Sequence, residues 1–282
     1  MAAAAAAAAR VKLALVQLAV GAQKAANLAN ARSRVLEAAR AGAQMVMLPE
    51  CFNSPYGTQY FGEYAEEAGG ESTAALAAMA REAQVYLVGG SIPERAGGRL
   101  FNTCTVWGPD GALLARHRKV HLFDIDVPGG ITFRESDVLQ AGDALTEFGT
   151  PWGRFGVAIC YDMRFPEMAM IAARRGCVGM LYPGAFNTTT GPLHWELLLR
   201  ARAVDNQIFT AGCSPARDAA VTYPTWGHST IVDPLARVVA TTGDAPDIVY
   251  GDLDMQLVED TRRSIPVSTQ RRFDLYPDVA SQ

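Results

Sequence analysis

The sequence predicts an α/β protein in which two internally similar halves form a four-layer α-β-β-α sandwich. Nearly continuous apolar segments, such as residues 11–20, are typical of strands that are covered on both faces. These segments alternate with segments of helical spacing, which predicts helices outside the sheets. The order strand, helix, strand, helix, strand, hairpin occurs twice along the chain. Two β-rich halves with outer helices therefore indicate two stacked sheets between two helical layers.

Composition restricts the class of partner. Of the 282 residues, 49% are hydrophobic and 19% are charged, so the chain can bury a large core. The net charge of -4 argues against binding to nucleic acid or an anionic membrane, because both require a basic surface. Outside the N-terminal alanines there is no apolar run of about 18 residues that could span a membrane. We therefore expect a small-molecule or protein partner, no nucleic acid and no membrane.

The cysteines indicate a reducing compartment. Five cysteines are an odd number, they are widely spaced, and none forms a C-x-x-C pair, which disfavours both a disulfide framework and a zinc knuckle. His117 and His121 are four residues apart, but their segment has the pattern of a strand and a turn, so no metal site is expected. We expect a cytoplasmic protein and leave an organellar pool open. The cysteines are Cys51, Cys104, Cys160, Cys177 and Cys213.

The first half begins after an alanine-rich segment, residues 1–10, which we interpret as a disordered tail. A β-α-β unit with parallel strands follows, and the helix ends at Gly42. The loop 52–70 is too long for a simple connection and predicts a lid or binding loop. A Gly-Pro-Asp-Gly turn at 108–111 predicts a hairpin. The predicted elements are strand 11–20, helix 27–41, strand 46–48, helix 72–83, strand 85–89 and hairpin 100–119.

The second half repeats this order. Its first strand leads into Cys160, and its hairpin turns at Asp233 and Pro234. We expect one domain over residues 11–256, followed by an extended C-terminal arm, residues 257–282, because four arginines occur there among prolines and aromatic residues. The predicted elements are a strand over 155–160, helix 166–175, strand 178–182, helix 195–204, strand 208–213 and hairpin 228–240.

Three segments place an ionisable group just beyond an apolar strand: Glu50, Lys119 and Cys160. A cysteine nucleophile needs a base, and Glu50 is a carboxylate in a place where other enzymes use histidine. Lys119 could keep that carboxylate ionised and stabilise a developing oxyanion. A helix beginning after Cys160 would lower the pKa of its thiol. Each residue also has an ordinary interpretation: Cys160 as a small buried side chain, Glu50 as an acid at a helix N-terminus, Lys119 as a solvated lysine.

Three motifs resemble the signature segments of the nitrilase superfamily of carbon-nitrogen hydrolases. They are L-P-E-C at 48–51, H-R-K-V-H-L-F-D at 117–124 and I-C-Y-D-M-R-F-P-E at 159–167. The resemblance spans residues 11–276 and places the family's catalytic Glu, Lys and Cys on Glu50, Lys119 and Cys160. The second glutamate of the family matches Glu135, which we include among the catalytic residues.

Within this superfamily, E-C-F-N-S-P-Y-G, H-L-F-D-I-D-V-P-G and R-A-V-D-N-Q resemble the omega-amidase branch. That branch hydrolyses the terminal amide of 2-oxoglutaramate and 2-oxosuccinamate and releases ammonia with 2-oxoglutarate or oxaloacetate. One departure is Gly130, where the branch more often has a lysine. The resemblance implies a cysteine thioester intermediate and no cofactor or metal.

The implied oxyanion hole consists of Lys119 and the backbone N–H of Tyr161. The substrate carries a 2-oxo acid, so its pocket needs a cation and hydrogen-bond donors. The candidate substrate-binding residues are Tyr56, Arg164, Thr189 and Arg202.

Two alternatives to an omega-amidase stay open. One is another amidase of the superfamily, such as one acting on deaminated glutathione or, less favoured, a true nitrilase. The other is a non-catalytic scaffold with the same fold. From the resemblance we also expect a homodimer or a higher homo-oligomer, with helices on the Cys160 side at the interface and the C-terminal arm reaching across.

Overall fold

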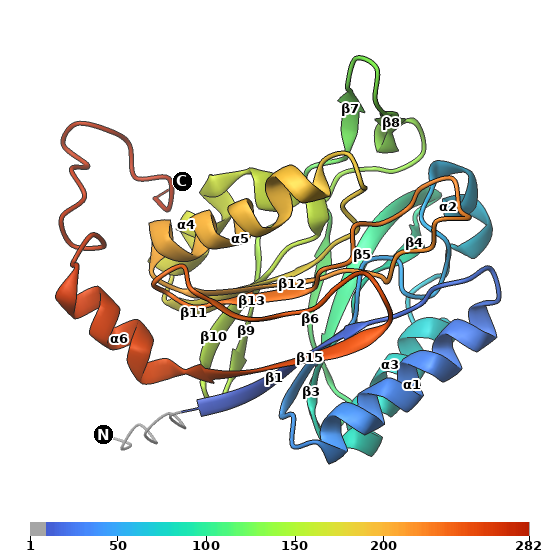
Figure 1. Cartoon of the computed structure of the whole chain (residues 1–282), viewed down its shortest axis with the longest axis horizontal. Helices are drawn as coiled ribbons and strands as arrows, with labels where there is room; N and C mark the ends of the chain where they lie inside the picture. Colours follow the sequence, from blue (N-terminus) through green and yellow to red (C-terminus); the bar gives the residue numbers. More distant parts are fainter. Residues whose placement is uncertain (1–9, 282) are drawn as a thin grey trace.

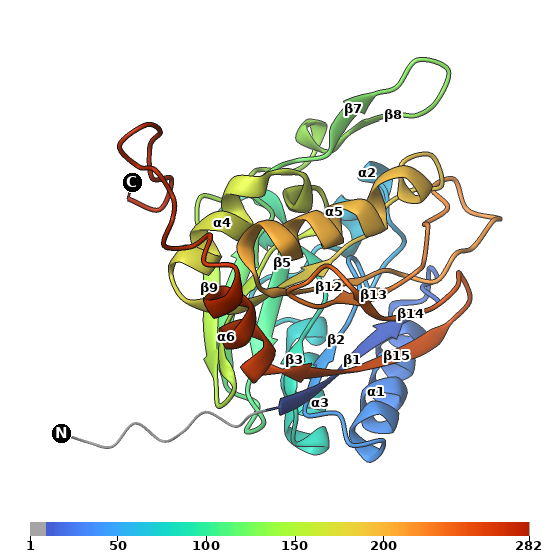
Figure 2. The ribbon, with the colours of Figure 1, turned by 60° about the vertical axis from the view of Figure 1, so that its left-hand side comes forward.

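The protein has four layers, with two sheets packed face to face and helices on both outer faces (Figures 1 and 2). The computed structural model describes residues 10–281. The predicted fold class is confirmed. The alanine tract of the predicted tail lies outside the described residues, but Arg10, which we had included in that tail, is the first residue of a strand and forms an ion pair of 2.9 Å with Asp254.

The first sheet contains seven strands. Parallel strands β1, β2 and β3 form its middle, and the eight residues of β1 pair antiparallel with β15 from the far end of the chain. The strand order is β15 (Asp247–Asp254), β1 (Arg10–Gln17), β2 (Met45–Met47), β3 (Tyr86–Val88), β5 (Arg99–Trp107) and β4 (Ile92–Ala96), with β6 (Leu113–Arg118) also paired to β5.

The second sheet contains six strands, and its parallel strands β10, β11 and β12 lie side by side. A separate two-stranded hairpin stands away from the body, as Figure 2 shows. The order in the six-stranded sheet is β14 (Val238–Thr241), β13 (Thr230–Val232), β12 (Phe209–Cys213), β11 (Cys177–Pro183), β10 (Gly153–Val157) and β9 (Thr146–Thr150); the separate hairpin is β7 (Asp124–Asp126) with β8 (Thr132–Arg134).

Helices α1 and α3 pack against the outer face of the first sheet, and α4 and α5 against that of the second (Figure 1). Most helices match the predicted segments to within a few residues. The short helix in the long loop was not predicted. The helices are α1 (Lys24–Arg40), α2 (Thr58–Tyr64), α3 (Glu71–Ala83), α4 (Pro166–Arg174), α5 (Gly191–Asn206) and α6 (Met255–Ser264), with 3-10 turns η1 (Glu135–Asp137) and η2 (Cys160–Arg164).

The predicted extended arm is wrong over its first eight residues. Residues 257–264 belong to α6, which starts where the side chain of Asp254 accepts a hydrogen bond from the backbone N–H of Gln256. Such an N-cap satisfies a donor that the first helical turn leaves free. Val258 is fully buried on the inner face of α6. Only residues 265–281 follow the body as turns without a helix or strand.

Successive side chains of a strand point to opposite faces of its sheet, and this alternation divides the apolar core into two parts. Leu13 and Leu15 of β1 face the second sheet, where they join a cluster with residues such as Phe155. Ala14 and Val16 face the opposite way and pack with α1 and α3. Period-two alternation therefore places one apolar face of β1 between the sheets and the other under the helices. Because both faces are buried, the strand ends are the places where polar groups can be grouped.

Candidate active site

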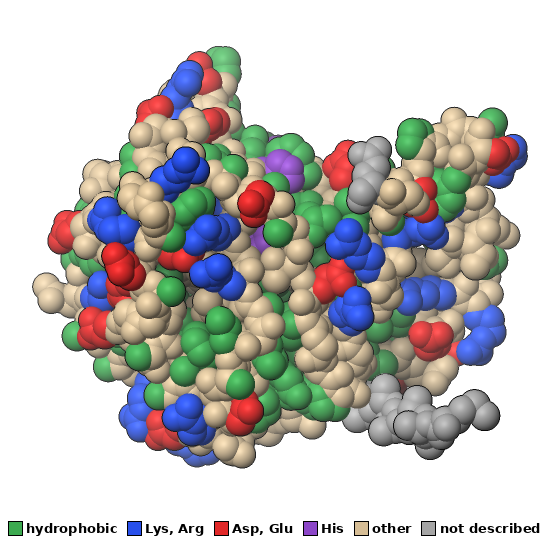
Figure 3. Space-filling model, turned by 180° about the vertical axis from the view of Figure 1, so that it is seen from behind, with side chains coloured by type: hydrophobic (Ala, Val, Ile, Leu, Met, Phe, Trp, Pro, Cys, Tyr) green, Lys and Arg blue, Asp and Glu red, His purple; other side chains and the backbone are tan. Residues whose placement is uncertain are grey.

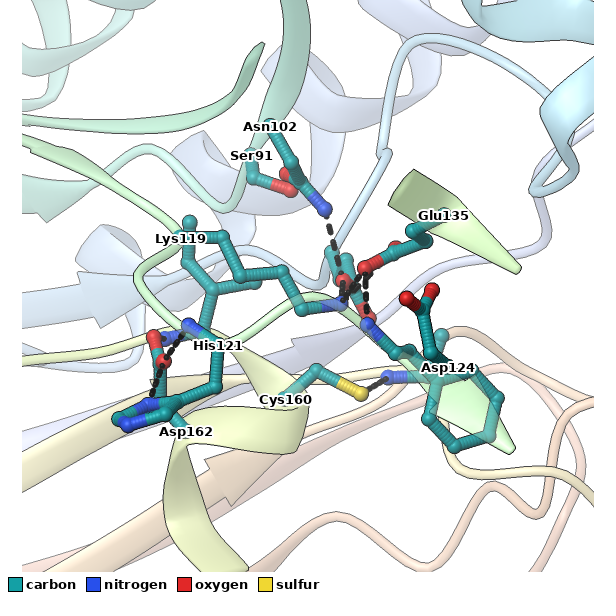
Figure 4. A network of polar contacts seen from close by, with 12 residues as sticks. Ser91, Asn102, Lys119, His121, Asp124, Glu135, Cys160 and Asp162 are labelled. Atoms are coloured by element: carbon teal, nitrogen blue, oxygen red, sulfur yellow. Dashed lines mark hydrogen bonds and ion pairs between the residues drawn. The ribbon is translucent and has the colours of Figure 1, made fainter. Parts of the chain in front are cut away.

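The structure brings the three predicted strand exits together. Glu50 follows β2, Lys119 follows β6, and Cys160 follows β10 of the facing sheet. Glu135 joins them as the first residue of η1, immediately after β8. Figure 4 shows the side chains of Lys119, Glu135 and Cys160 converging from these separate segments. Glu50, Lys119 and Glu135 are fully buried, and Cys160 is 3% exposed.

Lys119 lies between the two carboxylates. Its Nζ is 3.1 Å from Glu50 Oε1 and 2.9 Å from Glu135 Oε1. Asn102 donates a second hydrogen bond of 2.8 Å to Glu50 Oε1, whereas Glu50 Oε2 has no donor among residues 10–281. A buried ammonium requires such partners, because unpaired charge is costly away from water. Glu50 therefore keeps one oxygen fixed and one available.

Glu135 is held more completely. Tyr56 donates its hydroxyl to Glu135 Oε1 at 2.7 Å, and the backbone N–H of Phe123 donates to Oε2 at 2.8 Å. With Lys119, these contacts use both oxygens of the carboxylate. Glu135 is therefore suited to orient Lys119, while Glu50 has the oxygen that can accept a proton.

The turn at Cys160 has an unusual backbone. Cys160 has φ +48°, in the left-handed region that residues other than glycine rarely adopt. The backbone N–H of Ala185 donates to its Sγ at 3.4 Å. Cys51, directly after Glu50, also has a positive φ of 51°. Beside it, Gly90 has φ +64°, and a Cβ there would lie 2.2 Å from the carbonyl oxygen of Pro49, so only glycine fits.

Burial shapes the pKa values of these groups. Burial raises the pKa of Glu50, Lys119 opposes this change, and Glu135 adds to it. The pKa of Cys160 is raised well above its usual 9.0, first by burial and then by the charge of Glu50, although Lys119 and the Ala185 N–H act the other way. The expected lowering of the thiol pKa is therefore wrong: burial and the charge of the neighbouring carboxylate raise it instead. The resting site holds a neutral thiol beside a carboxylate with increased basicity.

Asp162 connects the Lys119 segment to the Cys160 turn. Its Oδ1 accepts from the backbone N–H and from Nδ1 of His121, both at 2.8 Å. Its Oδ2 accepts from the backbone N–H of Ile159 at 2.9 Å and from Nε2 of His117 at 3.1 Å. The carboxylate is fully buried, and hydrogen bonds from both histidines hold its pKa well below the usual range against the effect of burial. Asp162 therefore links the segment around Lys119, through His117 and His121, to the turn that contains Cys160.

The candidate substrate-binding residues lie in different settings. Tyr56 is in the site, bound to Glu135. Arg164 is half-buried; its guanidinium lies over the rings of Phe186 and Tyr161 and is 3.1 Å from His194 Nδ1. Thr189 is exposed in a turn.

Arg202 is buried, and its guanidinium donates to the carbonyl oxygens of Met163 and Arg164 at 3.0 and 3.2 Å. These bonds commit it to the main chain of the Cys160 turn.

Sequence reasoning missed an aromatic wall beside the thiol. Tyr56, Phe133 and Tyr223 come from three segments, and their ring centroids are 4.6 to 5.6 Å apart. A cavity of about 250 Å³ is lined by residues that include Glu50, Tyr56 and Tyr223, and its lining contains no lysine, arginine or histidine. Asn102 was also missed, although an asparagine within the apolar strand β5 could have indicated a buried polar role.

Within residues 10–281, no group of three or more His, Cys, Asp or Glu side chains is placed to hold a metal ion. In the same part of the chain, no helix is long and apolar enough to cross a membrane.

Fold and site together define the class: an α-β-β-α hydrolase with a buried Glu-Lys-Cys centre. The model of the carbon-nitrogen hydrolase family matches residues 12–263. A hydrolase of Schizosaccharomyces pombe is 58% identical over 95% of this chain and 84% of its own length, and an omega-amidase of Mus musculus is 57% identical over 94% and 96%. The crystal structure of a Saccharomyces cerevisiae member of branch 10 of the nitrilase superfamily is 43% identical, with a TM-score of 0.88, over 96% of this chain and all of that one. The chain belongs to the carbon-nitrogen hydrolase family.

Proposed function

We propose that this protein is an omega-amidase, which hydrolyses the terminal amide of 2-oxoglutaramate and 2-oxosuccinamate through a thioester on Cys160. The observation that carries the proposal is the 57% identity, over nearly the full length of both chains, to the omega-amidase of Mus musculus. The buried arrangement of Glu50, Lys119 and Cys160 supports it, because it provides a base, a cation and a nucleophile for acyl transfer.

In the first step, Glu50 takes the proton of Cys160 while sulfur attacks the amide carbon. The carbonyl oxygen becomes an oxyanion, which Lys119 and the backbone N–H of Tyr161 stabilise. As the oxyanion collapses, the C–N bond breaks and the leaving nitrogen takes the proton back from Glu50. Ammonia departs and a thioester remains.

In the second step, Glu50 takes a proton from water, and the hydroxide attacks the thioester carbon. The C–S bond then breaks to give the carboxylic acid, and the sulfur regains its proton from Glu50. Glu135 acts by orienting Lys119, since both of its oxygens are already bound.

Charge balance explains why proton transfer and attack occur together. At rest, two carboxylates face one ammonium, so the buried centre already carries an excess negative charge. A free thiolate beside Glu50 would add a second excess negative charge. The raised pKa of Cys160 is consistent with the cost of adding that charge. Passing the proton to Glu50 keeps the total charge constant. The thiolate therefore forms only as the carboxylate becomes neutral.

Arg164 is our proposed contact for the substrate carboxylate. The cavity beside Glu50 has no basic lining residue, so the cation for the substrate carboxylate has to come from outside that lining. Arg164 is in the Cys160 turn, its guanidinium is half-buried, and among the described residues no carboxylate forms a salt bridge with it. Tyr56 and Thr189 remain candidate donors, whereas the contacts of Arg202 favour support of the Cys160 turn.

We further propose a homodimer or higher homo-oligomer in the cytoplasm. Leu193 and Leu197 of α5 are 65% and 61% exposed, which suits an interface on the Cys160 side of the molecule. All five cysteines are unpaired, as a reducing compartment would maintain them. Light scattering coupled to gel filtration tests the assembly: a monomeric mass at micromolar concentration would contradict it.

Turnover tests the function directly. We expect ammonia release from 2-oxoglutaramate to exceed that from deaminated glutathione and from a nitrile analogue, and Cys160→Ala to abolish it. Cys177→Ala is the matched control, because Cys177 is buried opposite Arg154 near the start of β10, whereas Cys160 follows the end of that strand. A preference for deaminated glutathione would replace the assignment with the other amidase. Activity that survives in Cys160→Ala would refute the thioester, and an inactive wild type would favour a scaffold.

A further inference from the structure

Asn102 contacts both the base and the cation of the centre. It lies on β5 and is buried. Its side-chain Nδ2 donates to Glu50 Oε1 at 2.8 Å, and its backbone carbonyl oxygen accepts from the backbone N–H of Lys119 at 2.9 Å. Figure 4 shows the amide of Asn102 pointing toward the side chains of Lys119 and Glu135. One residue therefore holds the side chain of Glu50 and the main chain of Lys119.

The backbone around Glu50 is held separately, by Ser91. Its hydroxyl oxygen accepts from the backbone N–H of Cys51 at 3.0 Å, and its own backbone N–H donates to the carbonyl oxygen of Pro49 at 3.2 Å. The main chain on both sides of Glu50 is thus fixed without Asn102. What remains free is rotation about the side-chain bonds of Glu50, so the bond from Asn102 acts on the orientation of the carboxylate.

The side-chain oxygen of Asn102 has no hydrogen bond. An ionised carboxylate only accepts, so the amide has to present Nδ2 to Glu50 and direct Oδ1 elsewhere. Within residues 10–281 no donor reaches this Oδ1, which is buried. An unpaired buried acceptor lowers stability, and an apolar side chain of similar size would avoid that loss. The chemistry of the centre therefore explains an asparagine here better than the stability of β5 does.

A neutral donor suits the charge of the centre. On the face seen in Figure 3, Lys and Arg side chains lie beside Asp and Glu side chains, so opposite charges are interspersed. In the buried centre, by contrast, Glu50 and Glu135 share the ammonium of Lys119. A cation at position 102 would make Glu50 a weaker base, and a carboxylate there would add a third negative charge. An amide supplies a hydrogen bond without a charge, so it orients Glu50 and leaves it basic.

We propose that Asn102 is a positioning residue that selects Oε2 of Glu50 as the oxygen that carries the proton during catalysis. This role rests on the proposed amidase mechanism, in which Glu50 moves that proton between sulfur, the leaving nitrogen and water. Asn102 Nδ2 and Lys119 Nζ both donate to Oε1, so a proton on Oε1 would oppose two donor hydrogens. Oε2 has no donor among the described residues and can take the proton.

The bond from Asn102 matters most after Glu50 has taken the thiol proton. Glu50 is then neutral, and its attraction to the ammonium of Lys119 weakens. The amide of Asn102 still requires an acceptor, and in a carboxylic acid the acceptor is the oxygen without the proton. Asn102 therefore keeps Oε1 as the carbonyl oxygen and the O–H on Oε2 until the proton is passed on.

The competing explanation is that Asn102 only fills space in β5 and joins this strand to the segment after β6. The bond from the Lys119 N–H goes to the main chain of Asn102, so it would form with any side chain at this position. That explanation predicts that an apolar residue of similar size leaves the reaction unchanged.

Asn102→Leu separates the two explanations, because leucine has a similar size and neither the donor nor the unpaired acceptor. Misplacing a catalytic group by about 1 Å costs about a hundredfold in rate. The freed carboxylate is also a stronger base, which offsets part of this loss. We therefore expect kcat on 2-oxoglutaramate to fall by about tenfold or more, with little change in KM. Urea unfolding checks that the variant is folded.

The pH profile gives a readout that a purely structural role would not change. Loss of a donor to the carboxylate raises the pKa of Glu50, so the acidic limb of kcat/KM should move to higher pH by about one unit. The variant keeps the titratable groups that act on Glu50 or respond to its charge, which are Lys119, Glu135, Cys160, Cys51, Tyr56 and Tyr223.

Thr103→Val is the matched control. Thr103 is the next residue of β5, is also buried, and donates its hydroxyl to Glu94 at 2.6 Å, outside the centre. This variant loses one hydrogen bond to a buried carboxylate, as Asn102→Leu does. It should lower the free energy of unfolding and leave both kcat and the acidic limb as in the wild type.

Alkylation by iodoacetamide tests the role of Asn102 without an amide substrate. The sulfur of Cys160 attacks the CH₂ carbon, iodide leaves, and the thiol proton passes to Glu50. Mass spectrometry of the peptide that contains Cys160 gives the rate, which should be about tenfold lower in Asn102→Leu than in the wild type and in Thr103→Val. If the wild type hydrolyses no amide but this difference holds, the proposed function fails and the positioning of Glu50 by Asn102 stands.

A folded Asn102→Leu protein with unchanged kcat and an unchanged acidic limb would overturn the proposal. Equal alkylation rates in Asn102→Leu and Thr103→Val would also overturn it. If Asn102→Leu does not fold, Asn102→Ala takes its place, with the same losses expected.

Discussion

Replacing Asp162 by asparagine tests whether the hydrogen bonds that link the Lys119 segment to the Cys160 turn set the catalytic rate. Asp162 accepts four hydrogen bonds of 2.8 to 3.1 Å, two at each oxygen. The amide keeps one acceptor oxygen and loses the charge. Two bonds are therefore lost, and the other two weaken.

A hydrogen bond to a charged group contributes about 1.5–3 kcal/mol. Because a change of the His121 tautomer can restore one bond to the new amide, we expect Asp162→Asn to lower the free energy of unfolding by roughly 2–4 kcal/mol at pH 7. The pKa of Asp162 is depressed in the folded protein, so its stabilisation is complete above the unfolded pKa of about 4 and is lost as pH falls through the folded value. The difference between wild type and variant should therefore shrink below about pH 4, as urea unfolding at several pH values would measure.

The same change should lower kcat by about a hundredfold, because a displacement of about 1 Å between Lys119 and Cys160 misaligns the attack. KM should change little, since Asp162 is buried away from the cavity that borders Glu50. Asp124→Asn is the control: Asp124 is exposed and accepts from the backbone N–H of Ser136. A folded Asp162→Asn protein with unchanged kcat would refute the positioning role.

Two further outcomes follow from the site. The pKa of Glu50 is raised above its usual 4.5, so kcat/KM should fall as pH decreases through that raised value, because protonated Glu50 cannot accept the thiol proton; a profile that stays flat down to pH 4.5 would contradict this assignment. Arg164→Gln should raise KM for 2-oxoglutaramate by about tenfold and leave an uncharged amide unaffected, since one charge-assisted hydrogen bond to the carboxylate is lost. Arg154→Gln, an exposed change on β10, is its control, and equal losses on both substrates would show that Arg164 does not select the carboxylate.

Much of the fold and the centre could be predicted because the signals are local. The apolar strands and the spacing of the helices appear directly in the sequence, and Glu50, Lys119 and Cys160 each stand just beyond such a strand. The chemical types of these residues then suggested base, cation and nucleophile. Their grouping in one buried centre is what the structure adds to that pattern.

The remaining features depend on pairing between distant segments. In the pairing of β5 with β6, Thr103 lies opposite Arg118. The neighbours of these two residues, Asn102 and Lys119, are therefore brought together, and Asn102 can donate to Glu50. The direction of the Cys160 pKa shift depends on how deeply the thiol is buried, which a strand exit alone does not reveal. The helix α6 was concealed by its polar composition and is held by packing of a few residues such as Val258.

The pairing of β1 with β15 has a consequence for how the chain folds. Arg10 and Asp254, at one end of this pairing, are separated by 244 positions. During synthesis, β1 therefore presents an unpaired apolar edge until almost the whole chain has been made, and such edges favour aggregation. Contacts so distant in sequence also slow folding. We expect the nascent first half to depend on chaperones, and a fragment that stops before residue 247 to be insoluble even though it contains every residue of the Glu-Lys-Cys centre.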